Sequence, residues 1–419
     1  MFRFILDGLG EMFRGSLRYR LWLAGLAAII LWGALNYAHQ AQEGLVVTGM
    51  SDQVSWGFYI ANFAFLVGIA AAAVLLVIPA YIFHRTDIKK MVVIGEGMAV
   101  AAVIMAMMFV MADLGRPERA WHFLPIIGRF NFPMSVLAWD VLVLSGYLVL
   151  NLIIPFYLLY NHYRDREPNF KIYFSLLVLA MFWAISIHTV TAFMLSSNPS
   201  RPLWHTALLG PRFIASAFAS GPALIILTFM AIRRFTKMQF SQSVITTLAL
   251  IMAIAMQINV FFAGVELFTD FYNEGSHSAS MRYLFLGIGG AGALQPWIWS
   301  ALAMNITALV ILMIHPLRNN MKYLSIACVL GFVGIWLEKG MGLVVPGFIP
   351  TTLGEVFEYT PTALEINVGL GIWAFGIFVF SLLSKAAIAV ESGDMRDPTR
   401  TKNPPGDSSM ENRKEENHA

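Results

Sequence analysis

Long apolar runs, separated by shorter polar stretches, make up most of the chain. Ten of these runs are long enough to cross roughly 30 Å of hydrocarbon as α-helices, which rise about 1.5 Å per residue. They span residues 21–38, 54–83, 91–113, 133–160, 172–195, 210–232, 242–269, 294–314, 322–338 and 362–384. The expected fold class is therefore an all-α polytopic membrane protein with about ten transmembrane helices.

The two ends of the chain differ from this pattern. Residues 1–20 form an amphipathic lead with four arginines, and residues 385–419 form a polar tail of alternating charge that we expect to be disordered. A cleavable signal peptide is not expected, because Asp7 and Glu11 interrupt the lead and the first apolar run is too long. Residues 21–384 then form one transmembrane domain.

Lysine and arginine are distributed unevenly between the two sides of the expected membrane. The ends and the even-numbered loops hold 21 of the 28 basic residues. The positive-inside rule therefore predicts a multi-pass protein of the cytoplasmic (inner) membrane with both termini in the cytoplasm. The outer loops lie around residues 39–53, 114–132, 196–209, 270–293 and 339–361. Their length favours a docking surface for a partner outside the membrane over simple connections.

Composition restricts the cofactors that the chain can hold. Hydrophobic residues make up 58% and charged residues 13%, as in membrane proteins. The single cysteine, Cys328, cannot form an internal disulfide or ligate an iron–sulfur cluster alone. His188 is the only histidine well inside an apolar run, so a haem with two histidine ligands is not expected. We expect neither a metal site nor a nucleic-acid partner.

The segment from Met111 to Asp140 carries most of the unusual chemistry. Between two apolar runs it gathers acids, three arginines, a histidine and two tryptophans, and Asp140 lies about 12 Å inside the fourth run. Ionisable groups inside a membrane are costly and are functional candidates. Asp140 is either paired with Arg116 or Arg119 as a structural acid or a proton acceptor in a pocket open to the outside.

Aromatic and polar side chains near Asp140 favour the pocket. Trp56, Tyr59 and Asn62 follow one another at a spacing of three, which predicts that they share one face of a helix. With Trp139 and His188 they would suit a flat ring as ligand. Further polar residues in the outer half of the membrane are Gln257, Asn259, Glu266 and Glu338.

Two other groups of charges allow alternative interpretations. Glu96, in the inner half, is expected to be a helix-start residue that reaches the membrane interface rather than the mouth of a proton path. Arg116, Arg119 and Arg129 lie on the outer side against the general trend. They either pair with Asp113 and Glu118 or contact an acidic partner or a ligand oxygen.

The segment Asp113-Leu-Gly-Arg-Pro-Glu-Arg-Ala-Trp-His122 resembles the NrfD/PsrC family, the quinone-interacting membrane subunits of respiratory oxidoreductases. The resemblance covers nearly the whole chain except its ends. It includes the segments 56–62, 131–140, 186–191, 197–205 and 211–222. It implies two adjacent four-helix bundles plus additional helices, and a menaquinone (or related quinone) pocket near the outer face.

The same resemblance implies the partners. Electrons would pass between the quinone pool and a periplasmic ferredoxin-like iron–sulfur subunit, with this chain holding no haem or iron–sulfur cluster. A multihaem cytochrome c and further membrane or cytoplasmic redox subunits are expected, in a complex of dissimilatory sulfur metabolism. Other complexes of the family, linked to hydrogenases or resembling polysulfide reductase, are the alternative.

These implications assign roles to individual residues. Asp140 and His188 are the expected proton acceptors, and His122 or Asp113 would lead protons to the outer water. The expected ring contacts are Trp56, Tyr59, Asn62, Arg119 and Trp139. Arg116 and Trp121 are expected to contact the partner.

Two other classes of function compete with this one. A secondary transporter would also have ten spans, and usually has helices broken by Gly or Pro in corresponding places of two halves. Gly221-Pro222 is the nearest case, and it has no clear counterpart. The third possibility is a structural anchor for outer redox subunits.

Overall fold

The computed structural model of the chain describes residues 1–71, 74–77, 86–124, 126–236, 241–272 and 275–397. Within these ranges the protein is helical and contains no β-strand. The long helices are α2 (Leu17–Glu43), α5 (Thr86–Asp113), α6 (Val136–Tyr163), α7 (Phe170–Ser196), α8 (Leu209–Phe235), α9 (Gln242–Tyr272), α11 (Gln295–Met313), α13 (Met321–Lys339) and α14 (Ala363–Glu391). All nine are long and apolar enough to cross a membrane. The all-α polytopic fold is thereby confirmed.

The second predicted span is the exception in length. It contains α3 (Phe58–Ala70) and the single turn α4 (Val74–Val77), and the rest of its inner part, residues 72–73 and 78–83, lies outside the described residues. Every residue of α3 is buried, so this helix is surrounded by protein and not by lipid. The remaining short elements are α1 (Phe2–Phe13), η1 (Leu45–Val47), η4 (Pro117–Phe123), α10 (Ser276–Leu286), α12 (His315–Arg318) and η5 (Val345–Phe348).

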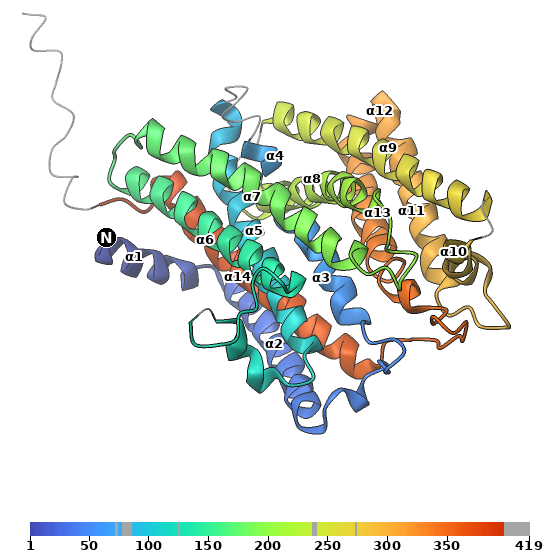
Figure 1. Cartoon of the computed structure of the whole chain (residues 1–419). Coiled ribbons are helices and arrows are strands. Elements are labelled where there is room, and N and C mark those ends of the chain that lie inside the picture. Colours follow the sequence, from blue (N-terminus) through green and yellow to red (C-terminus); the bar gives the residue numbers. More distant parts are fainter. Residues whose placement is uncertain (72–73, 78–85, 125, 237–240, 273–274, 398–419) are drawn as a thin grey trace, which may run out of the picture.

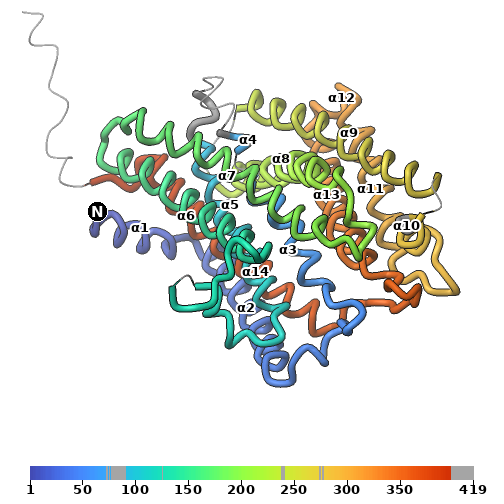
Figure 2. Tube along the Cα trace, in the orientation of Figure 1, coloured from blue at the N-terminus to red at the C-terminus, as the bar shows by residue number. Residues whose placement is uncertain are grey.

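The long helices form two four-helix groups and a pair. Helices α3, α5, α6 and α7 pack into a first bundle, and α8, α9, α11 and α13 into a second (Figure 1). The pair α2 and α14 packs along α5 (Figure 2). Gly33 and Gly371 meet where α2 and α14 cross, and the lack of side chains there lets the two backbones approach closely.

We call the end of the helices that carries the N-terminus and the last described residues the terminal end and the opposite one the loop end. The terminal end holds α1 and the end of α14, and the loop end holds η1, η4, α10 and η5 (Figure 1). The loop end therefore collects the long connections that the sequence predicts on one side.

The structure differs from the sequence-based expectation at the end of α14 and at Glu96, and it also shows the course of α8 through Gly221 and Pro222. Helix α14 continues to Glu391, seven residues beyond the expected end of the span, and residues 398–419 of the expected tail lie outside the described residues. The sequence predicts Glu96 at a helix start, but α5 begins ten residues earlier and Glu96 is buried. Helix α8 runs through Gly221 and Pro222 without a break, which removes the feature that favoured a transporter.

Candidate functional site

Asp140 lies buried between α6 and α7 in the half of the first bundle nearer the loop end. The hydroxyl of Thr191 on α7 donates a hydrogen bond of 2.8 Å to its Oδ1 atom. Arg116, one of the two arginines considered as its partner, instead pairs with Glu118 at 3.5 Å on the exposed surface. The observed partner of Asp140 is thus a neutral hydroxyl.

His188 lies on α7 one turn from Thr191 and is also buried. Its Nδ1 atom stands 3.0 Å from the carbonyl oxygen of Ala184. Because that oxygen can only accept, Nδ1 carries the proton, and Nε2 of the neutral ring is an acceptor. Nε2 is buried and has no hydrogen-bond partner among the described residues. Such an unused acceptor inside a membrane protein is a feature of a binding or catalytic site.

A second polar cluster occupies the loop end between α2, α3, α5 and α14. The Tyr59 hydroxyl donates to Oε1 of Gln40 at 2.6 Å, and Nε2 of Gln40 donates to the carbonyl of Ala112 at 2.7 Å. Asp113 follows Ala112 in the chain, and its Oδ1 atom is buried without a partner in the described part of the chain. Gln40 thus links Tyr59 to the residue that precedes Asp113.

The expectation that Trp56, Tyr59 and Asn62 share one face is wrong. The Trp56 ring stacks on Trp204 with centroids 5.6 Å apart, whereas Asn62 Oδ1 accepts from the indoles of Trp336 and Trp373 at 3.0 Å each. Trp56 is not on this helix at all, because α3 begins at Phe58. Tyr59 and Asn62 are on α3, but their hydrogen-bond partners come from different helices, α2 for Tyr59 and both α13 and α14 for Asn62.

The loop between α5 and α6 keeps most of the remaining candidates at the surface. Arg116, Arg119 and Trp121 are exposed, and Trp121 stacks on the ring of His122 with centroids 3.9 Å apart. Trp139 is also exposed and donates from its indole to the carbonyl of Pro133 at 2.9 Å. Arg119 and Trp139 therefore lie on the outside of the protein, separate from the buried Asp140.

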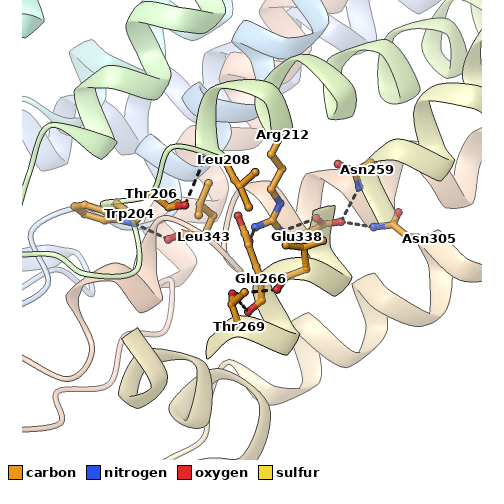
Figure 3. A network of polar contacts seen from close by, with 11 residues as sticks. Trp204, Thr206, Leu208, Arg212, Asn259, Glu266, Thr269, Asn305, Glu338 and Leu343 are labelled. Atoms are coloured by element: carbon orange, nitrogen blue, oxygen red, sulfur yellow. Dashed lines mark hydrogen bonds and ion pairs between the residues drawn. The ribbon is translucent and has the colours of Figure 1, made fainter. Parts of the chain in front are cut away.

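The largest buried ionic network is in the second bundle, where sequence reasoning predicts no site. Arg212 on α8 binds two carboxylates, Glu266 of α9 and Glu338 of α13, the latter at 2.7 Å (Figure 3). The other oxygen of Glu338 accepts from the amides of Asn305 at 2.6 Å and Asn259 at 3.3 Å. The network joins all four helices of the bundle.

Lys339 places a further ionisable group between the two bundles. It is buried, its Nζ atom donates to the carbonyl of Phe213 at 3.1 Å, and Nζ stands 3.8 Å from the centre of the Phe213 ring. It also lies beside Gly68 of α3. Lys339 of the second bundle thus lies against α3 of the first.

The sequence contains a pattern of charged residues that indicates this network. Arg212, Glu266, Glu338 and Lys339 all lie within about two helical turns of the loop end, and their charges are balanced. Opposite charges at equal depth in different apolar runs are expected to pair, because an isolated charge in a membrane is costly. Glu266 and Glu338 stand out in the sequence as polar residues of the outer half, but their pairing with Arg212 was not predicted.

Tyrosine and glutamate side chains fasten the loop end outside the membrane-spanning segments. Tyr359 donates to Oε1 of Glu365 at 2.5 Å and accepts from the amide of Phe58 at 2.7 Å, which links the starts of α14 and α3. Burial, and secondarily the charge of Glu365, raise the pKa of Tyr359 well above its ordinary value of 10. Its hydroxyl stays protonated at neutral pH.

Within the described residues no group of three or more His, Cys, Asp or Glu side chains is arranged to hold a metal ion. The cavity beside the Arg212 network is small and is lined by Arg212, Phe213, Ser216, Asn259, Glu338, Lys339 and Leu343. The arrangement offers proton acceptors and hydrogen-bonding groups inside the membrane.

Comparison with known proteins gives a consistent picture. The chain is 27% identical over 395 residues to the Hdr-like menaquinol oxidoreductase integral membrane subunit of Archaeoglobus fulgidus, a match that covers 89% of this chain and 96% of that protein. It is 20% identical over 392 residues to the menaquinone reductase integral membrane subunit of Nitratidesulfovibrio vulgaris, covering 87% and 90%. It is 24% identical over 319 residues to the protein NrfD of Escherichia coli, covering 69% and 93%.

The family model described as polysulphide reductase, NrfD, matches residues 46–344, from the loop before α3 to the loop after α13. This range contains both four-helix bundles, the site around Asp140 and His188, and the network of Arg212. The chain belongs to the NrfD family, whose relatives here include membrane subunits of menaquinol oxidoreductase-type complexes.

Proposed function

We propose that the chain is the quinone-reactive membrane subunit of a redox complex, and that it exchanges electrons between menaquinone and an iron–sulfur subunit at the loop end. The observation that carries the proposal is a pair of buried acceptors. His188 is on α7, and Asp140 of α6 is bonded to Thr191, which lies one turn along α7 from His188. The names of two relatives, a menaquinol oxidoreductase subunit and a menaquinone reductase subunit, support the choice of quinone.

The residues present fit the demands of quinol oxidation. A bound menaquinol supplies two electrons and two protons, and the protein must take the protons. His188 is fixed by its bond to Ala184, so that Nε2 is the accepting atom. Asp140 is held by Thr191 and offers a carboxylate that no cation in its described surroundings neutralises. Both groups are thus oriented to accept a proton.

Protons would leave toward the loop end through Asp113 or His122. Asp113 has a buried oxygen without a partner in the described structure, and His122 is only partly buried. Of the expected ring contacts, Tyr59 belongs to the cluster at the loop end, where its hydroxyl is bonded to Gln40. Trp56 and Asn62 are occupied by other aromatic side chains, and Arg119 and Trp139 lie at the surface.

The loop between α5 and α6 would form the docking surface for the iron–sulfur subunit. Besides Arg116 and Arg119 it exposes several large apolar side chains close together in the sequence, which monomeric surfaces seldom display. These are Trp121, Leu124, Ile126, Ile127, Phe132 and Met134. Arginine together with exposed aromatic and aliphatic side chains is typical of protein interfaces.

The sulfur context rests on the sequence resemblance to DsrP, the membrane subunit of the DsrMKJOP complex. In such a complex the iron–sulfur partner is ferredoxin-like and periplasmic, and a multihaem cytochrome c completes the outer part. The basic residues at the terminal end support a cytoplasmic position of that end in this arrangement.

Binding of a quinol analogue to the purified complex tests the proposal. We expect Asp140→Asn and His188→Ala each to weaken binding about tenfold or more, measured by quenching of tryptophan fluorescence, since the first removes the carboxylate charge and the second removes the Nε2 acceptor. Asp52→Asn, at an exposed position of the loop end, is the matched control and should bind as the wild type does. Unchanged affinity in both buried variants, in assembled complexes, would place the quinone elsewhere.

A further inference from the structure

A second cavity lies at the terminal end, toward the opposite end of α6 from Asp140. It occupies about 840 Å³, including its open side, between α1, α5, α6 and α14. Its lining is almost entirely apolar, and Asn151 is its single amide side chain. The amide nitrogen of Asn151 is already bonded to the carbonyl of Tyr147 at 2.8 Å. Such a lining suits a hydrocarbon chain and not a polar ring.

Helix α1 closes one side of this cavity. Phe4, Gly8 and Met12 of α1 line it, and Gly97 and Leu383 line the opposite side. Two polar contacts along α1 hold it in place. The Tyr163 hydroxyl donates to Asp7 at 2.8 Å, and Lys385 pairs with Glu11 at 3.1 Å.

Only part of the apolar surface of α1 packs against the rest of the protein. Phe2, Leu6, Leu9 and Phe13 remain exposed while Phe4 is buried against α6. An amphipathic helix with such exposed apolar residues lies in the boundary between headgroups and acyl chains. The cavity behind it therefore opens at the depth where the acyl chain of a lipid begins.

Directly after α1 the sequence contains three exposed arginines, Arg14, Arg18 and Arg20. The hydroxyl of Tyr19, which lies between two of them, donates to the carbonyl of the lining residue Met12 at 2.9 Å, so this segment is held at the rim. None of the three arginines has an ion-pair partner within the described residues, whereas Glu11 and Asp7 nearby are engaged. The rim is therefore positively charged.

We propose that this cavity binds one anionic phospholipid, with an acyl chain between α1, α5, α6 and α14 and the phosphate at Arg14, Arg18 and Arg20. Charge complementarity selects an anionic headgroup, since guanidinium groups bind phosphate well. The apolar lining selects the chain. The site is separate from the proposed quinone site, and it is independent of that proposal.

The test uses two glycines of α1 as a matched pair. An added side chain at either Gly8 or Gly10 meets nothing within 4 Å, but only Gly8 lines the cavity. Gly8→Leu should therefore fill the cavity without disturbing the fold, and Gly10→Leu controls for helix propensity. Lipids retained by the full chain, extracted from membranes in lipid nanodiscs and released into mild detergent, are identified by native mass spectrometry.

We expect the wild type and Gly10→Leu to retain an anionic phospholipid, and Gly8→Leu to retain about tenfold less, because excluding even two methylenes from the cavity has that effect. Replacing Arg14, Arg18 and Arg20 together by Gln should abolish the preference for anionic over zwitterionic phospholipid. Equal retention by Gly8→Leu and Gly10→Leu would overturn the proposal. So would a quinone in place of the phospholipid, or retention by the wild type without headgroup preference.

Discussion

At the scale of single residues, the buried polar side chains divide into those with all partners present and those without. Asn62 belongs to the first kind, since its oxygen accepts from two indoles and its nitrogen donates to the carbonyl of Phe58. His188 belongs to the second, with one ring nitrogen used and one free of partners in the described structure. Satisfied groups fix the fold, and each unsatisfied group needs an explanation. Asn259, Glu266 and Asn305 of the Arg212 network also keep one unpartnered oxygen each in the described structure, and we assign only the free nitrogen of His188 to a ligand.

This division predicts different effects of substitution. Asn62→Leu should lower stability by about 1–3 kcal/mol, because it leaves the indoles of Trp336 and Trp373 without their acceptor. Thermal unfolding followed by tryptophan fluorescence measures the change. Asn161→Ala removes an amide that bonds only within its own helix and should have little effect. An equally small effect of Asn62→Leu would show that the bridge between the indoles is not structural.

Tyr359 gives a residue-scale prediction for pH. Its pKa is raised in the folded protein, so the unfolded chain releases the proton first as the pH rises. The stability that Tyr359 contributes is therefore present below about pH 10 and is lost above it. The thermal midpoint of wild type should fall between about pH 9 and 11 more steeply than that of Tyr359→Phe, in scans followed by tryptophan fluorescence. Parallel curves for the two proteins would contradict this assignment.

At the scale of elements, the sequence located every long helix but not how each one is oriented. Apolar runs are sufficient to place α5, α6 or α9, because only a helix satisfies the backbone inside a membrane. They do not tell which side faces protein or at which residue a helix begins. The prediction of a shared face for Trp56, Tyr59 and Asn62 was wrong because α3 begins only at Phe58 and is buried on all sides. The prediction for Glu96 was wrong for a related reason. The first residues of α5 are polar and were not recognised as helical, so the helix begins ten residues before Glu96.

The network of Arg212 predicts how strongly elements depend on one another. Glu338→Ala should destabilise the second bundle by about 3 kcal/mol, because it removes one of the two carboxylates bound to Arg212 and leaves the amides of Asn259 and Asn305 without their acceptor. Glu118→Ala removes an exposed partner of Arg116 and should cost at most about 1 kcal/mol. The two thermal midpoints provide the comparison. Similar midpoints would mean that the network of Arg212 is not needed to hold the four helices together.

At the scale of the whole molecule, the two bundles differ in what their buried polar groups can do. The acids of the second bundle are matched by Arg212, whereas Asp140 in the first is bonded to a hydroxyl. Lys339 lies between them, beside α3 and α8. Asp140 and His188 could be predicted as candidates because they are isolated ionisable residues in apolar runs. The network of Arg212 was not predicted, although Arg212, Glu266 and Glu338 lie at a similar depth in their apolar runs. The sequence does not tell which distant runs are neighbours, and only the fold brings them together.

The oxidation rate of a quinol analogue by the assembled complex tests the central claim most directly. With Asp140 and His188 as proton acceptors, Asp140→Asn should lower the turnover rate by about a hundredfold or more, the usual contribution of a general base. Asp52→Asn should retain the wild-type rate. Wild-type turnover by an assembled Asp140→Asn complex would contradict the account and leave Asp140 as a structural group between α6 and α7.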